Sequence, residues 1–154
     1  MFTPENLKKI EDLRTRYPTA RALVLPVLWM AQEQAGWISR DTMEHVASLL
    51  NLPLGHVYSV VTFYTMFNTK PTGKYHLQVC TNVSCQLRGA DKIVEHICER
   101  LRIPLGGMTS DEKFTVSEVE CLGSCGTAPA IQVNDDYYED LTPEKVDKLL
   151  TGLK

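Results

Sequence analysis

The sequence lacks any apolar run long enough to cross a membrane. The longest such run, residues 22–31, has ten residues and contains Pro26, whereas a transmembrane helix needs about 20. The first residues, MFTPENLKKIEDL, also lack the apolar core of a signal peptide, and their charges are mixed. We therefore expect a cytoplasmic protein that meets a membrane only through its partners.

A strong excess of charge and the common motifs of catalysis are also missing. The net charge is −3, divided as +1 over residues 1–70 and −4 over residues 71–154, so no basic surface for nucleic acid is expected. No G-x-G-x-x-G or G-x-x-x-x-G-K-[ST] motif occurs. No Ser/His/Asp or paired-carboxylate arrangement can be argued, and the histidines have no ligand spacing. We expect no substrate site in this chain.

Helical patterns fill the first part of the chain. Thr3 precedes Pro4 as a helix cap precedes a first-turn proline, and Pro26 is expected to bend or delay the second helix. Four helices are expected: residues 4–17, 19–35, 40–50 and 53–63. The aromatic segment 63–67 is expected mainly to pack between helices, with a partner surface as the second interpretation. Residues 68–73 form an expected linker.

Strand patterns dominate the second part of the chain. The expected order is strand, helix, then three strands and a final helix, over residues 75–80, 90–101, 114–119, 130–133, 137–138 and 143–150. The long connection after the first strand favours parallel pairing of the first two strands. The fold class is α+β: a helical bundle domain at residues 1–70 and a second domain, with a small mixed sheet, at residues 74–154.

Five cysteines stand in a chain without an export signal, which points to metal or redox chemistry. Cys98 shares a helical face with apolar residues and is interpreted as a small core residue. The other four form two pairs, C-x4-C at Cys80 and Cys85 and C-x3-C at Cys121 and Cys125. The first cysteine of each pair is expected to end a strand and the second to lie in the following loop.

Loops that follow two parallel strands meet at one edge of a sheet, so the four thiols are expected to converge. Four thiolates bind either an iron–sulfur cluster or a structural zinc ion, and the spacings alone leave these two near even. A redox-active dithiol and a disulfide are weaker alternatives. Gly123 and Gly126 would leave backbone N–H groups free for cluster sulfurs, while Ser84 and Ser124 are donors or simple turn residues.

The pattern C-x4-C, thirty-five residues, then C-L-G-S-C-G-T-A-P resembles the thioredoxin-like [2Fe–2S] ferredoxin subunit family of NADH:quinone oxidoreductase (complex I). Residues 55–67 also resemble the helical N-terminal region of that family. The resemblance implies a thioredoxin-like second domain and iron–sulfur rather than zinc. It implies that Cys80, Cys85, Cys121 and Cys125 bind the [2Fe–2S] cluster. It also raises the chance that the peptide bond before Pro129 is cis.

The same resemblance implies the chain's role and its partners. It implies an electron-carrier subunit of an NADH dehydrogenase of the respiratory chain, without a catalytic site of its own, whose cluster exchanges single electrons with the FMN of a partner that binds NADH. A further iron–sulfur subunit is the second implied partner, and assembly would place the chain peripherally at the inner membrane. The alternatives are the equivalent subunit of an NAD-linked hydrogenase or formate dehydrogenase, or a zinc-stabilised thioredoxin-like binding module.

Overall fold

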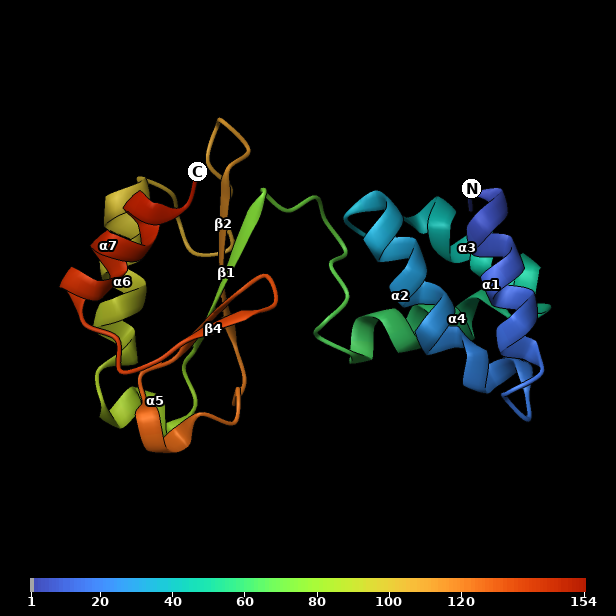
Figure 1. Ribbon diagram of the computed structural model, residues 1–154, viewed down its shortest axis with the longest axis horizontal. Coiled ribbons are helices and arrows are strands. Elements are labelled where there is room, and N and C mark those ends of the chain that lie inside the picture. The colour runs from blue at the N-terminus through green and yellow to red at the C-terminus, as the bar shows by residue number, and fades with distance from the viewer. Residues whose placement is uncertain (1) are drawn as a thin grey trace. The chain divides into compact units, whose positions relative to one another are not determined.

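The computed structural model describes residues 2–154, which divide into two compact units with the boundary between Pro71 and Thr72. The first unit is helical and the second combines a sheet with helices (Figure 1). The helices of the first unit are α1 (Pro4–Arg14), η1 (Ala20–Leu23), α2 (Val24–Ala35), α3 (Arg40–Leu50) and α4 (Leu54–Phe63). Within residues 2–154, no helix combines the length and apolarity that a membrane crossing requires.

Local sequence signals set the helix ends of the first unit. Thr3 and Ser39 accept hydrogen bonds from backbone N–H groups in the first turns of α1 and α3. Pro26 lies in the first turn of α2, where a missing N–H costs little, and a short 3₁₀ turn precedes that helix. Gly36 ends α2 in a left-handed conformation with φ 80°. Apolar faces of these helices then form one buried core.

The expected burial of the aromatic segment is wrong for most of its residues. Phe63 is 76% exposed and Met66 43% exposed, whereas Phe67 is buried at 5%. The reason is helical geometry, because α4 buries Val57 and Val61, which are four residues apart and define its inner face. Tyr58 and Phe63 on α4 and Tyr64 just after it are exposed, so this segment presents aromatic surface.

The second unit is built on a mixed sheet with strand order β2-β1-β3-β4. Its elements are β1 (Tyr75–Cys80), α5 (Val83–Leu87), α6 (Ala90–Leu101), β2 (Phe114–Val119), η2 (Cys125–Thr127), β3 (Ile131–Val133), β4 (Asp136–Tyr138) and α7 (Pro143–Gly152). β1 and β2 are parallel, as expected, and β3 pairs antiparallel with both β1 and β4. The α+β class is therefore confirmed.

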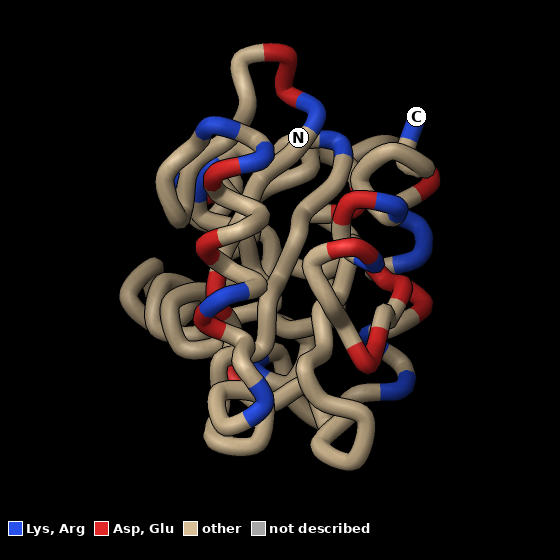
Figure 2. The backbone as a smooth tube through the Cα atoms, turned by 90° about the vertical axis from the view of Figure 1, so that its left-hand side faces the viewer, with Lys and Arg blue, Asp and Glu red and all other residues tan. Residues whose placement is uncertain are grey.

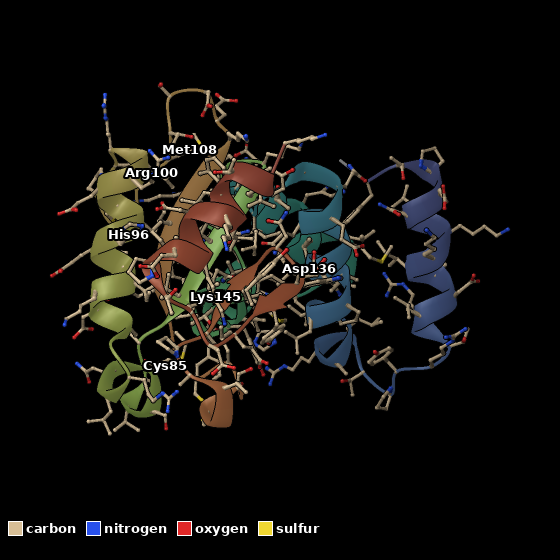
Figure 3. The ribbon with its side chains drawn as sticks, turned by 60° about the vertical axis from the view of Figure 1, so that its left-hand side comes forward. Cys85, His96, Arg100, Met108, Asp136 and Lys145 are labelled. Atoms are coloured by element: carbon tan, nitrogen blue, oxygen red, sulfur yellow. The ribbon has the colours of Figure 1, made fainter. Side chains whose placement is uncertain are left out.

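Helices α6 and α7 cover one face of this sheet (Figure 1). Asp147 of α7 ties them together, because its Oδ1 accepts hydrogen bonds from Arg100 Nε at 3.2 Å and, with the ring suitably protonated, from His96 Nε2 at 3.1 Å. Figure 3 shows both labelled side chains on α6. Beneath the helices lies an apolar core that contains none of the four paired cysteines. The peptide bond between Ala128 and Pro129 is cis.

Gly73 fits closely against the start of β2 and gives a first testable prediction. Its N–H donates to Thr115 Oγ1 at 2.7 Å, and a Cβ added here would lie 2.9 Å from backbone atoms of Phe114. We expect Gly73→Ala to lower the free energy of unfolding by about 1–3 kcal/mol, as overpacking against rigid atoms does. Urea denaturation followed by circular dichroism measures this. Gly152→Ala is the matched control, because its added Cβ meets nothing within 4 Å; equal effects would contradict the prediction.

Candidate metal centre

The four paired cysteines lie at one edge of the sheet, where the parallel strands β1 and β2 end. Cys80 is the last residue of β1 and is opposite Val119, the last residue of β2. Backbone hydrogen bonds extend this alignment, from Thr81 N–H to the Val119 carbonyl at 3.2 Å and from Cys80 N–H to the Ala130 carbonyl at 3.1 Å. The sheet therefore brings both cysteine segments together, as the strand order predicts.

Two details of the expected placement are wrong. Cys85 lies inside the short helix α5 rather than in a loop, because Asn82 caps a helical turn that starts at Val83. Cys121 does not end a strand, since β2 stops two residues earlier at Val119, and Cys125 begins the 3₁₀ turn η2. Figure 1 shows α5 and η2 next to each other below the sheet, and Figure 3 labels Cys85 at that end.

The thiols form two contacting pairs with different exposure. Cys80 and Cys85 are buried, at 2% and 3% exposed, among the small side chains of Ala90, Ala128 and Ala130. Burial, followed by a hydrogen bond with Cys80, raises the pKa of the Cys85 thiol. Cys121 and Cys125 are exposed, and their Sγ atoms are 3.4 Å apart. One edge of the site is therefore enclosed and the other is open.

Backbone and hydroxyl groups adjust the exposed pair. The Gly123 N–H donates to Cys121 Sγ at 3.4 Å and is the first cause that lowers the pKa of Cys121, with Cys125 the second. The hydrogen bond with Cys121 in turn raises the pKa of Cys125, while Ser84 contacts Cys125 and opposes that rise. Gly123, at φ 84°, thus donates to a cysteine sulfur, whereas the expected donation to cluster sulfurs stays a prediction. Ser124 instead contacts the Glu139 carboxylate.

The two pairs also interact with each other. Cys125 contributes to the raised pKa of Cys85, and Cys80 contributes to that of Cys125. Among residues 2–154, however, no group of three or more His, Cys, Asp or Glu side chains is placed to hold a single metal ion. One zinc ion would need all four sulfurs at about 2.3 Å. Four cysteine thiolates are also the usual ligands of an iron–sulfur cluster, and this donor set fits such a centre.

The segments that carry the cysteines contain no charged residue. Residues 75–87 and 121–134 include no Lys, Arg, Asp or Glu, and the loops at the lower edge of Figure 2 are correspondingly tan. Val83 and Leu87, both on α5, are 64% and 84% exposed. Protruding aliphatic side chains on α5 therefore flank the site, while the carboxylates of Glu120 and Glu139 lie beside the segment that carries the exposed pair.

Sequence reasoning missed three side chains near the thiols. Asn82 Nδ2 donates to Glu120 Oε2 at 2.9 Å, and Arg88 Nε donates to the Ala128 carbonyl at 3.0 Å. The signal for Asn82 was present, because asparagine between a strand and a polar turn is a preferred helix cap. The sequence does not predict the hydrogen-bond partners of Glu120 and Arg88, because each of these bonds joins segments far apart in the chain.

A mixed four-stranded sheet with helices on one face, and two thiol pairs beyond its parallel strands, is the arrangement of a thioredoxin-like protein with paired cysteines at one sheet edge. The model of the family described as thioredoxin-like [2Fe-2S] ferredoxin matches residues 10–154. The chain therefore belongs to the thioredoxin-like [2Fe–2S] ferredoxin family, and its cofactor is a [2Fe–2S] cluster.

Curated relatives match along almost the whole chain. A protein of Rickettsia bellii, named as a subunit of NADH-quinone oxidoreductase, is 47% identical over 99% of this chain and 93% of its own length. The protein of the same name from Rickettsia felis is 50% identical over 97% of this chain and 91% of its own. A solved NAD+-reducing [NiFe]-hydrogenase in the H2-reduced state superposes with a TM-score of 0.75 at 23% identity. That match covers 89% of this chain and 23% of the hydrogenase chain, and it shows the fold.

Proposed function

We propose that Cys80, Cys85, Cys121 and Cys125 bind one [2Fe–2S] cluster, with each contacting pair serving one iron. The observation that carries this proposal is the convergence of two thiol pairs at the ends of β1 and β2, with Cys121 and Cys125 3.4 Å apart. Four cysteine thiolates are the usual ligands of such clusters. The lowered pKa of Cys121 supports the proposal, because iron binds the thiolate rather than the thiol.

When bound, the cluster supplies one-electron chemistry, and the chain decides where that chemistry is accessible. Cys80 and Cys85 are buried among alanine side chains, which keep water from one edge of the site. Cys121 and Cys125 lie on the exposed edge, which is where electrons would enter and leave a bound cluster. The Gly123 N–H holds negative charge at Cys121 Sγ. Such hydrogen bonds to ligand sulfur help to set a reduction potential.

We further propose that the chain is the electron-carrier subunit of an NADH:quinone oxidoreductase. Support comes from relatives named as a subunit of that enzyme, which match at 47–50% identity over nearly their whole length. The partner would be the flavoprotein subunit that binds FMN and NADH, and its FMN would exchange single electrons with the cluster. A second iron–sulfur subunit would complete the complex, which would hold this chain peripherally at the membrane.

An NAD-linked hydrogenase is the second system with a related subunit. The sequence identity to the NAD+-reducing hydrogenase is only 23%, so that match shows a shared fold and no more. The curated relatives that share about half of their residues with this chain carry the name of the quinone-linked enzyme instead. The quinone-linked complex is therefore the proposal we adopt.

Affinity purification from the native source tests the proposal. We expect about two irons and two acid-labile sulfides per chain, together with a co-purified chain that contains FMN and membrane subunits that react with quinone. Stoichiometric zinc without sulfide would reject the cluster. A co-purified nickel-containing subunit, with no quinone-linked subunit, would reject the choice of complex. The proposal that this chain binds a cluster would be unaffected.

A further inference from the structure

The short helix α5 carries Cys85 but has little to hold it in place by itself. It spans only Val83–Leu87, and isolated helices of this length are unstable. Its first and last residues, Val83 and Leu87, are 64% and 84% exposed, so they pack against little of the unit. The position of Cys85 relative to the other thiols therefore depends on the contacts of its own buried thiol with Cys80 and Ala130 and on what fastens the ends of α5 to the neighbouring segment.

One side chain, Asn82, fastens the start of α5. Its Oδ1 accepts a hydrogen bond from the Val83 N–H at 3.0 Å, which caps the helix. Its Nδ2 donates to Glu120 Oε2 at 2.9 Å, and Glu120 directly precedes Cys121. A single amide therefore caps the helix that carries Cys85 and also reaches the segment that carries Cys121.

The far end of α5 is fastened to the same segment. Arg88 follows α5, and its Nε donates at 3.0 Å to the carbonyl of Ala128, a buried residue three positions after Cys125. The backbone hydrogen bonds of Cys80 and Thr81 to Ala130 and Val119 stop before α5 begins. The sheet hydrogen bonds hold the chain up to Thr81, and side-chain hydrogen bonds at the two ends of α5 then attach this helix to residues 120–128.

We propose that Asn82 and Glu120 form a clasp that positions Cys85 against the Cys121 segment and slows release of the cluster. The inference rests on the proposed cluster ligands and assigns a role to two residues outside the ligand set. Neither residue binds iron. They are positioning residues, and they act by keeping the two thiol pairs together while a bond to iron transiently opens.

A donor–acceptor swap in the full chain tests the clasp. Asn82→Asp keeps an oxygen that caps α5 but has no donor for Glu120 and adds a like charge beside it. We expect a chelator to remove iron from the loaded N82D chain about five- to tenfold faster than from the wild type, the factor that loss of one such hydrogen bond predicts. In N82D/E120Q the introduced amide donates to the introduced carboxylate, so release should return to within about twofold of the wild-type rate.

The measurement is the loss of visible absorbance in excess chelator, started from chains that contain two irons and two sulfides. Glu118→Gln is the matched control, because it removes an exposed carboxylate two residues from Glu120 and should leave the rate unchanged. If N82D folds poorly, Asn82→Ser keeps a capping oxygen and loses the amide that donates to Glu120, so it should also release iron faster.

Three outcomes would overturn the clasp. The first is release of iron at the wild-type rate from both Asn82 variants. The second is equal release rates from N82D and N82D/E120Q. The third is release from E118Q that is as fast as release from N82D. Each requires a wild-type chain that is fully loaded at the start. A wild-type chain without iron and sulfide would instead overturn the proposed function, so the two failures are distinguishable.

Discussion

Replacing Cys85 with alanine is expected to abolish the cluster, lowering iron and sulfide from about two of each per chain to almost none. Alanine offers no donor atom, and Ala90, Ala128 and Ala130 pack around this buried edge of the site. Cys80→Ala should have the same effect. At Cys121 and Cys125 the thiols are exposed, so a serine hydroxyl there can still approach iron, and Cys→Ser should weaken the cluster rather than remove it. Iron and sulfide analysis, with the EPR signal of the reduced chain, measures both effects.

Cys98→Ala is the matched control for these variants. Cys98 lies on α6, partly buried against the core, and burial raises the pKa of its thiol. Cys98 packs against the apolar core that contains none of the four paired cysteines, so it is not placed to bind the cluster. The EPR signal should be unchanged, and its loss would show that the ligand assignment is wrong.

The second large effect concerns the core beneath the site. Leu77 is fully buried in β1, between Val116 of β2 and Val133 of β3. We expect Leu77→Ala to lower the free energy of unfolding of the second unit by about 3 kcal/mol, within the range of 2–5 found for buried leucines. For a unit of this size the melting temperature should fall by about 10–20 °C. Loss of the visible spectrum of the loaded chain on heating reports on this unit alone.

Leu87→Ala provides the comparison for Leu77→Ala. The chemical change is identical, but Leu87 is 84% exposed, so the melting temperature should move by only a few degrees at most. A similar fall in both variants would mean that the spectrum reports on cluster loss from α5 rather than on unfolding of the core.

The regular elements could be predicted because their signals are local. Thr3, Ser39 and Thr142 each stand one residue before a helix and cap it. The apolar alternation of residues 75–79 identified β1, and the length of the connection after it identified parallel pairing with β2. Such features depend on residues that are close in sequence, so residue type and spacing were sufficient to predict them.

Features that depend on contacts between distant segments could not be predicted. Exposure of Phe63 depends on which face of α4 meets the rest of the bundle, and apolar residues lie on more than one face of this helix. The helical state of α5 depends on Asn82, whose amide is oriented by Glu120 some forty positions later. Spacing alone left zinc and iron–sulfur open, because both metals accept four thiolates at short intervals. Family membership identified the cofactor.

The separation between the apolar core and the cysteines has a consequence for how the cofactor arrives. Small zinc domains stay unfolded until metal binds, because the metal replaces a core. Here the sheet and its helices bury Leu77, Val116, Ile131 and their neighbours without help from any paired cysteine. The second unit can therefore fold before iron is delivered. The empty cysteine site can then take up a cluster, lose it and take it up again while the unit stays folded.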